Sequence, residues 1–480
     1  MYSPSKKYIK FLKSSLTEEN PFIATNEVKQ WVKRQMDKTN VDIRFTSFDN
    51  LEKWHLDMSD GVLRHESNRF FSVIGIQVQT NFGEIDEWQQ PIILQPEIGY
   101  LGFITKEFNG ILYFLVQAKI EPGNINTVQL SPTLQATKSN YTRAHRGKVP
   151  DYYEYFADRD KSEVLLDQLQ SEQGARFLKK RNRNIIIETK EDIEVKSNFI
   201  WLTLGQLKKL LSMDNIVNMD TRTVISGISF GSLSIRSGEY LSVIKDPLKR
   251  DSFSGLLPSA LSSDDGINTL DDIIAWFTNL KSQYELHIRQ IPLNQISEWS
   301  IGESEISRPD KKFFSVIGTS ITIDSREVSK WMQPMVKPAQ DGLNVFIIRR
   351  INGVYHFLVQ AKVECGNFDI IEMAPTVQCI TGNYRNTEEG SLPYLGYALS
   401  APKSQIIFDT MQSEEGGRFY REQNRNMIIV ADKKFPSEIP ENYCWMTLYQ
   451  LLNFIKFNNY LNIQARNLIA AISFSGEDYE

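Results

Sequence analysis

One stretch of the chain places groups suited to acid–base chemistry on a single face of an expected strand. Residues 114–124 run Phe-Leu-Val-Gln-Ala-Lys-Ile-Glu-Pro-Gly-Asn. Alternate strand residues point the same way, so Gln117, Lys119 and Glu121 share a side, and Gly-Asn ends the strand in a turn. Such a face either borders solvent or lines a polar pocket. In a pocket, the carboxylate could take a proton while the ammonium holds negative charge or tunes the carboxylate.

The same stretch returns at residues 357–367, and most of the chain repeats with it. Phe70–Gly75 recurs as Phe313–Gly318, and the pattern of 170–177 recurs at 412–419. A repeat this long indicates a duplicated domain and not a solenoid unit. We therefore expect an N-terminal arm at 1–23, a first repeat at 24–230, a linker at 231–268, a second repeat at 269–474 and a tail at 475–480.

Composition and charge exclude several classes of protein. The net charge of −5 with a pI near 5.8 gives no basic field for non-specific nucleic-acid binding. The three cysteines all fall in the second repeat without metal-ligand spacing, which indicates free thiols in a reducing compartment. The start lacks an apolar signal region, and no run reaches transmembrane length. These features predict a cytoplasmic protein without a nucleic-acid or membrane partner.

The elements that must position the polar strand are short strands mixed with helices. Strands are expected at 70–78, 98–104 and 112–120, from runs of apolar and β-branched residues. Helices are expected from Asn26, with Val28, Trp31 and Val32 on one face, and at Val164–Lys180 with its counterpart Ile406–Glu422. This mixture predicts an α+β fold with mixed sheets flanked by helices.

Several motifs taken together resemble one enzyme family, the NDP-hexose 2,3-dehydratases. They are Arg69-Phe70-Phe71-Ser72-Val73, Gln95-Pro96-Glu97-Ile98-Gly99, residues 117–124, Ser131-Pro132-Thr133-Leu134-Gln135-Ala136-Thr137, residues 139–147 and Asn218-Met219-Asp220-Thr221-Arg222-Thr223. The resemblance covers both repeats and leaves out the arm and most of the linker.

The resemblance implies two tandem Nudix-like domains, a homodimer and a dTDP-linked 4-keto-6-deoxyhexose as substrate. The implied product is a 3,4-diketo-2,6-dideoxy sugar nucleotide, unstable enough to need a downstream 3-ketoreductase. The chemistry requires neither metal nor redox cofactor. Two alternatives stay open: a non-catalytic nucleotide-sugar-binding protein, and a Nudix pyrophosphohydrolase. The second is disfavoured because Ser413–Gly417 lacks the other elements of a metal-binding Nudix box.

Elimination needs a base for the proton on carbon three and an acid for the leaving hydroxyl on carbon two. Candidates for these roles and for holding the enolate are His65, Lys119, Glu121, Tyr141 and His145. His65 stands opposite Arg308 in the second repeat, and Arg cannot serve as a base, which favours the first repeat as the reacting one. Which residue is base and which is acid stays open, as does a catalytic second repeat.

Substrate binding needs cations for the diphosphate and an aromatic ring for the base. The candidates are Gln117, Arg143, Arg146, Arg176, Arg183 and Trp88 in the first repeat, with Tyr384 and Arg418 in the second. Trp88 recurs as Trp331 and Tyr141 recurs as Tyr384, so packing explains these aromatic residues as well as function does.

Overall fold

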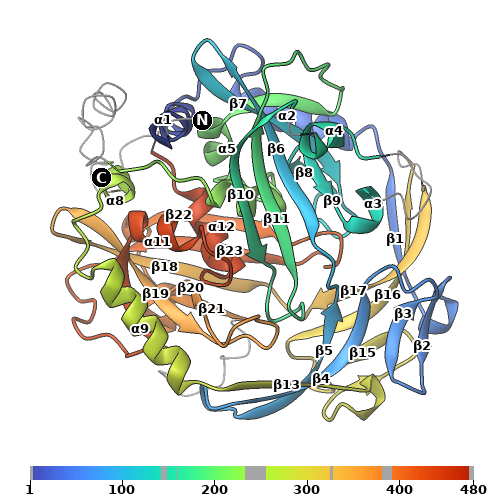
Figure 1. Ribbon diagram of the computed structural model, residues 1–480. Helices are drawn as coiled ribbons and strands as arrows, with labels where there is room; N and C mark the ends of the chain where they lie inside the picture. Colours follow the sequence, from blue (N-terminus) through green and yellow to red (C-terminus); the bar gives the residue numbers. More distant parts are fainter. Residues whose placement is uncertain are drawn as a thin grey trace.

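The computed structural model describes residues 4–141, 149–158, 160–232, 256–324, 328–380 and 392–474. Each repeat builds one seven-stranded sheet, and both repeats together build two five-stranded sheets. In Figure 1 the five-stranded sheets lie below and to the right of the seven-stranded ones. The α+β class with mixed sheets and two similar halves is therefore confirmed.

The seven-stranded sheet of the first repeat carries the polar strand at its centre. Its order is β10-β11-β6-β7-β12, with β8 paired to β7 and β9 paired to β6. The strands are β6 (Gly99–Phe108), β7 (Ile111–Ile120), β8 (Val128–Ser131), β9 (Leu134–Ala136), β10 (Glu163–Ser171), β11 (Arg181–Glu188) and β12 (Phe199–Thr203). Only the β11–β6 pair among these is parallel.

The second repeat builds the matching sheet in the same way. Its order is β20-β19-β18-β23-β22, with β21 paired to β18 and β24 paired to β19. The strands are β18 (Gly342–Ile351), β19 (Val354–Lys362), β20 (Glu372–Ala374), β21 (Val377–Ile380), β22 (Ile406–Ser413), β23 (Gln423–Val430) and β24 (Tyr443–Thr447). Here the parallel pair is β18–β23.

The five-stranded sheets exchange a strand between the repeats. β1 (Val41–Thr46) pairs along its whole length with β16 of the second repeat, and β13 (Leu286–Ile291) pairs with β4 of the first. One sheet is β1, β14 (Ser300–Ile301), β15 (Glu305–Ser307), β16 (Phe314–Ile323) and β17 (Lys330–Pro338). The other is β13, β2 (Trp54–Asp57), β3 (Val62–His65), β4 (Ser72–Thr80) and β5 (Glu87–Leu94). Each repeat thus completes a sheet of the other.

Helices cover the sheets and begin at polar caps. The Thr203 hydroxyl accepts from the Gln206 N–H while the Gln206 side chain accepts from the Thr203 N–H, and Thr447 with Gln450 repeats this box. The helices are α1 (Pro4–Ser15), α2 (Thr25–Met36), α3 (Lys138–Tyr141), α4 (Tyr153–Ala157), α5 (Leu204–Leu210), α6 (Met219–Ser226), α8 (Leu256–Leu261), α9 (Leu270–Gln283), α10 (Leu395–Ser400), α11 (Leu448–Phe454) and α12 (Ile463–Ala471). Single 3-10 turns are η1 (Phe48–Asn50), η3 (Leu293–Gln295) and η5 (Lys403–Gln405).

One apolar core runs through both repeats. It joins Phe103 and Phe114 of the first large sheet to Phe346 and Phe357 of the second, by way of α5, α6, α11 and α12. Two fully buried arginines, Arg222 and Arg466, lie on its helices α6 and α12. Arg222 donates to the Ser413 carbonyl at 2.5 Å, and Arg466 donates to the Ser171 carbonyl, so each repeat satisfies a strand end of the other.

The expected helices at Val164–Lys180 and Ile406–Glu422 are wrong. Both segments are strands, β10 and β22, followed by a turn. A bulge between Val164 and Leu166 places Leu165 and Leu166 next to each other in the interior, which breaks the alternation expected of a strand. Gln170 near the end of β10 is a polar residue that is buried, which further obscures the alternation of apolar and polar residues expected of a strand.

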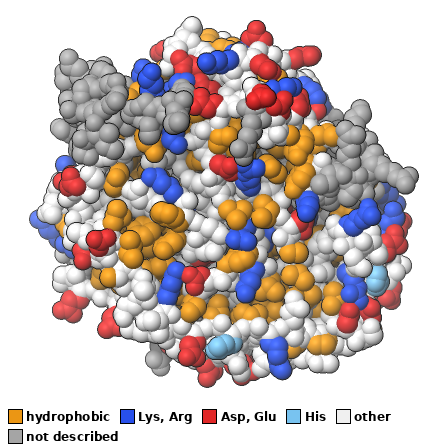
Figure 2. Space-filling view, in the orientation of Figure 1, with side chains coloured by type: hydrophobic (Ala, Val, Ile, Leu, Met, Phe, Trp, Pro, Cys, Tyr) orange, Lys and Arg blue, Asp and Glu red, His pale blue; other side chains and the backbone are white. Residues whose placement is uncertain are grey.

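The surface carries no field of one sign on the face shown in Figure 2. Basic and acidic side chains are interspersed there over both repeats. On this face, binding of an anionic ligand would depend on local cations. Within the described part of the chain, no helix combines the length and apolar character needed to cross a membrane.

Candidate active site

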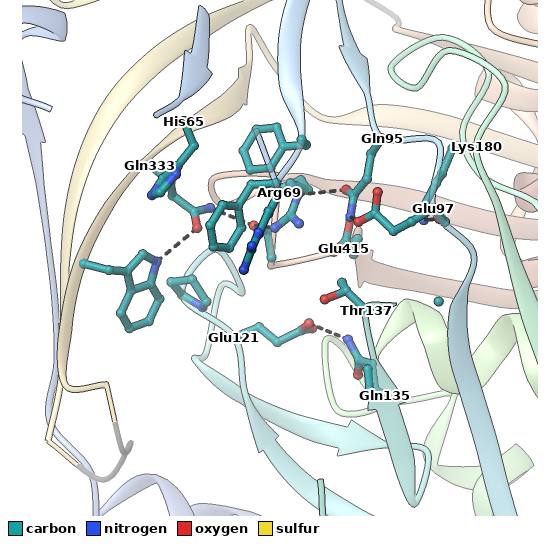
Figure 3. Close-up of a pocket in the computed structure, with 18 of the residues that line it drawn as sticks. His65, Arg69, Gln95, Glu97, Glu121, Gln135, Thr137, Lys180, Gln333 and Glu415 are labelled. Atoms are coloured by element: carbon teal, nitrogen blue, oxygen red, sulfur yellow. Dashed lines mark hydrogen bonds between the residues drawn. The ribbon is translucent and has the colours of Figure 1, made fainter. Parts of the chain in front are cut away.

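A cavity of about 850 Å³ opens beside the end of β7 (Figure 3). First-repeat side chains line it from β3, from the segment before β6, from β7 and β9, and from the start of α6. The second repeat contributes Trp331, Met332 and Gln333 of β17 and Glu415, Gly417 and Arg418 from the turn after β22. The cavity is therefore built by both repeats.

Lys119 and Glu121 both face this cavity, while Gln117 is half-buried and does not line it. The Lys119 ammonium donates to the Gln135 carbonyl at 3.2 Å. The Glu121 carboxylate accepts from the Gln135 amide at 2.6 Å, and the Gln135 oxygen accepts from Asn218 at the start of α6. The carboxylate is thus held in one orientation from β9 and α6, as a proton-transfer group requires.

Carboxylates outnumber cations in the depth of the cavity. Asp220 and Glu415 lie within electrostatic reach of each other and of both Glu121 and Glu172, with Lys119 and Lys180 as counter-charges. Burial raises the pKa of Glu172 and of Asp220, and it raises the pKa of Glu415 to about 7. Burial lowers the pKa of Lys180, opposed by Glu97 and Glu172. Such a set holds protonated and ionised carboxyl groups side by side near neutral pH.

His65 lies at the rim, between the rings of Trp54 at 5.5 Å and Phe70 at 4.4 Å. Its Nδ1 accepts from the Ser67 N–H at 3.1 Å, so a neutral ring carries its proton on Nε2 and can donate from there. In Figure 3, His65 and Lys180 lie toward opposite ends of the cavity, with Arg69 between them.

Tyr141 and Arg183 lie together outside the lining of this cavity. The Tyr141 ring stacks on Tyr153 at 5.6 Å and meets Tyr100 at 5.2 Å. Arg183 donates to the Tyr100 hydroxyl and pairs with Asp167 through both Nε and Nη2. Arg143, His145, Arg146 and Tyr384 lie outside the described residues.

Trp88 and Arg176 do not line the cavity either, whereas their counterparts Trp331 and Arg418 do. The Trp331 indole donates to Gln333, whose amide donates to the Gly417 carbonyl; Trp88 and Gln90 make the same contacts toward the Ala175 carbonyl. The two networks are equivalent, and each joins a strand to a turn of the same repeat. The β17 residues nevertheless line the cavity that holds Lys119 and Glu121 of the first repeat.

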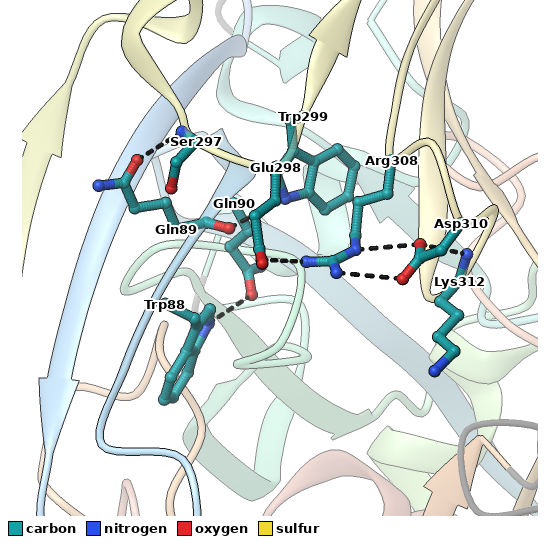
Figure 4. A network of polar contacts seen from close by, with 9 residues as sticks. All are labelled: Trp88, Gln89, Gln90, Ser297, Glu298, Trp299, Arg308, Asp310 and Lys312. Carbon is teal, nitrogen blue, oxygen red and sulfur yellow. Dashed lines mark hydrogen bonds and ion pairs between the residues drawn. The ribbon is translucent and has the colours of Figure 1, made fainter. Parts of the chain in front are cut away.

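The second repeat has Arg308 at the position of His65 (Figure 4). There Arg308 donates to Glu298 at 2.6 Å and to both oxygens of Asp310 at 3.1 Å. These ion pairs occupy the guanidinium with neighbouring carboxylates.

Sequence reasoning missed several lining residues as site residues, namely Arg69, Glu97, Glu172, Asp220 and Glu415. A signal for two of them was present in the repeat. Asp220 stands opposite Gln464 and Glu415 opposite Gln173, so charge changes between the repeats at both positions.

The family model described as NDP-hexose 2,3-dehydratase matches twice, at residues 25–228 and 270–472. The chain belongs to the NDP-hexose 2,3-dehydratase family. It is therefore an enzyme of the hydro-lyase type, which removes water from a nucleotide-linked hexose.

Three curated relatives support this assignment, each described as a dTDP-4-dehydro-6-deoxy-alpha-D-glucopyranose 2,3-dehydratase. The dehydratase is 42% identical to the relative from Saccharopolyspora spinosa over 96% of this chain and 94% of that one. It is 38% identical to the relative from Amycolatopsis orientalis, over 96% and 92%. It is 40% identical to the relative from Streptomyces violaceoruber, over 89% and 92%.

Proposed function

We propose that the dehydratase acts on dTDP-4-keto-6-deoxyglucose in deoxysugar biosynthesis. It removes the carbon-two hydroxyl and yields the 3,4-diketo-2,6-dideoxy sugar nucleotide. The name shared by the three relatives supports the substrate. The observation that carries the proposal is the oriented Glu121 carboxylate beside the Lys119 ammonium on one wall of the cavity.

Glu121 is the base in this proposal. The 4-keto group acidifies the proton on carbon three, so an oriented carboxylate can remove it. The resulting enolate is negative, and the Lys119 ammonium on the same strand face is placed to stabilise that charge. A positioned base of this kind contributes roughly 10²–10⁴-fold to the rate.

The diphosphate binds at the rim, where the cavity meets solvent. Arg69 is exposed there, and Arg418 lies inward with its guanidinium 4.2 Å from the Phe71 ring and its Nε donating to Gln95. Planar guanidinium groups match phosphate oxygens in pairs. His65 lines the cavity on the same rim.

Each repeat has a Nudix-like domain in this proposal, since each builds a mixed sheet flanked by helices around one parallel strand pair. The active enzyme is a homodimer in the cytoplasm. Its product is an unstable diketone, so a 3-ketoreductase acts downstream.

Incubation with dTDP-4-keto-6-deoxyglucose, with and without a chelator, tests the proposal. The expected result is loss of one water by mass spectrometry, insensitive to the chelator, with a chemical reductant trapping the diketone. Magnesium-dependent release of a nucleoside monophosphate would identify a pyrophosphohydrolase instead. Binding without turnover would identify a nucleotide-sugar-binding protein.

A further inference from the structure

The turn that follows β22 reaches from the second repeat into the first-repeat cavity. Three contacts fix its backbone: the Gly123 N–H donates to the Gly416 carbonyl at 2.7 Å, the Val336 N–H to the Arg418 carbonyl at 2.9 Å, and Arg222 to Ser413. The position of Glu415 is therefore set by β7, β17 and α6 together.

The first repeat sends an equivalent turn toward the second. The Gly366 N–H donates to the Gly174 carbonyl at 2.6 Å, and the Ile93 N–H donates to the Arg176 carbonyl at 2.9 Å. With the same backbone anchors on both turns, what distinguishes them is their side chains. Gln173 stands where the other turn has Glu415, and Ala175 stands where it has Gly417.

These two differences give the first-repeat turn an amide and the second-repeat turn a carboxylate with room beside it. Gln173 donates to the buried Glu414 carboxylate, which occupies its amide. In the described part of the chain no hydrogen bond or ion pair within 4 Å engages the Glu415 carboxylate. A Cβ on Gly417 would lie 2.7 Å from Glu415 Oε1 and 3.9 Å from Glu121 Oε1. The missing Cβ leaves room for Glu415 next to the base.

We propose that Glu415, supplied by the second repeat, is the acid that protonates the leaving hydroxyl in the first-repeat site. The inference rests on the proposed function. It also explains why the first repeat reacts: its cavity holds two carboxyl groups around Gly417, whereas the reciprocal turn offers an amide.

The proton and electron movements balance with these two groups. Glu121 takes the carbon-three proton, and the electron pair of that bond passes through the enolate into a double bond between carbons two and three. The carbon–oxygen bond at carbon two breaks, and the departing oxygen takes the Glu415 proton and leaves as water. The enol then returns its hydroxyl proton to Glu415 while carbon two gains the proton from Glu121, so both groups end as they began.

The surroundings keep Glu415 protonated near neutral pH. Burial and the negative charges of Glu172 and Glu121 raise its pKa to about 7, against the opposing cations Arg418 and Lys180. Asp220, whose pKa Glu415 itself raises, faces the same space. We expect kcat to fall as pH rises above about 7, because the acid form is then lost.

Glu415→Gln tests the inference through two separate rates. The variant should lose roughly 10²–10⁴-fold in kcat for water release, with little change in KM. It should still exchange the carbon-three proton for deuterium in heavy water, because Glu121 is intact. The decline of kcat above pH 7 should disappear. Gly417→Ala, which pushes the carboxylate aside without removing it, should slow water release and keep the exchange.

Glu422→Gln is the matched control. Glu422 is another buried glutamate of the second repeat, and burial also raises its pKa to about 7, but it does not line the cavity. It should leave both rates unchanged. Water release by Glu415→Gln at the wild-type rate would overturn the inference, and so would loss of deuterium exchange along with water release. Failure of the wild-type protein to release water would instead overturn the proposed function.

Discussion

At the scale of single residues, the two repeats present nearly the same polar strand. Lys362 donates to the Gln378 carbonyl at 3.4 Å, and Glu364 accepts from the Gln378 amide at 2.8 Å, as Lys119 and Glu121 do with Gln135. The strand motif alone therefore does not decide which repeat reacts. In our proposal the residues that face it decide this, and Glu415 among them comes from the other repeat.

Glu121→Gln and Glu364→Gln form a matched pair on this point. Glu121→Gln should lower kcat by roughly 10²–10⁴-fold, since it removes the base but keeps an acceptor for Gln135. Glu364→Gln should leave kcat within a few-fold of wild type. Steady-state turnover of the dTDP-sugar measures both, with circular dichroism as the check on folding. Loss of turnover in Glu364→Gln alone would place the reaction in the second repeat.

A second residue-scale prediction concerns Lys208, which is fully enclosed between the two repeats. Its ammonium donates to the Ile472 carbonyl at 2.5 Å at the end of α12, near the rings of Phe230 and Phe474. Burial lowers its pKa from 10.5 to about 7. Between these values the folded state binds fewer protons than the unfolded state, so the free energy of unfolding should rise with pH, by up to roughly 1.4 kcal/mol per pH unit.

Denaturant unfolding at pH 7, 8 and 9 measures this slope. Lys208→Met should remove it, because Met fills similar space without a titrating group. Lys209→Met is the control, since Lys209 is exposed and pairs with Glu18. If Lys208→Met keeps the wild-type slope, another group causes it.

At the scale of elements, the glycine that ends the polar strand has a second reason to be glycine. The sequence indicates a turn there. The structure shows that the Phe419 carbonyl of the second repeat lies where a Cβ on Gly123 would be, and the Phe177 carbonyl lies in the same way against Gly366. Each glycine is thus the position against which the turn of the other repeat packs.

Gly123→Ala and Gly366→Ala should both destabilise the protein, by about 1–3 kcal/mol or more, because a backbone carbonyl must move. Only Gly123→Ala should also lower kcat, since the displaced turn carries Glu415 and Arg418 into the cavity. Thermal unfolding and steady-state kinetics on the two variants give the comparison. Equal loss of activity in both would mean that the turns do not differ in function.

The sequence predicts elements well where the burial pattern is simple and fails where polar residues are buried. The strands that became β4, β6 and β7 follow runs of apolar and β-branched residues. The strand β10 was missed because its bulge and the buried Gln170 imitate helical spacing. Gln170 is buried because its amide donates to the Ile455 carbonyl of the second repeat, a contact that a single sequence does not reveal.

The site was predictable only in part. His65, Lys119 and Glu121 line the cavity together, and Arg418 joins them from the second repeat. Trp88 and Arg176 do not line it, and the Arg176 guanidinium lies instead 4.2 Å from the Phe314 ring of the second repeat. No local signal in the sequence reports this contact.

At the scale of the whole molecule, the repeats interlock at three levels. They exchange the strands β1 and β13. The turn of each repeat packs against a glycine of the other, Gly123 or Gly366. Arg222 and Arg466 each donate to a carbonyl at a strand end of the other repeat. The glycines of β4 and β16 fit this exchange: a Cβ on Gly75 would lie 2.6 Å from the Ile291 carbonyl oxygen. The repeat boundaries at 24–230 and 269–474 remain a prediction, but the two halves share one core.

We therefore expect the chain to unfold as one unit and its halves to fold only together. A cut within 233–255 would place β1 and Lys119 on one polypeptide and β16 and Glu415 on the other. Each half alone would expose the sheet edge that pairs with the exchanged strand, the buried arginine and its half of the shared apolar core. The stabilisation lost by exposing these groups exceeds the free energy of unfolding of a marginally stable fold. Co-expressed halves should co-purify, unfold in one calorimetric transition and release water from the dTDP-sugar, while neither half alone should do so. A first-repeat half that is active by itself would show that the second repeat supplies nothing to the site.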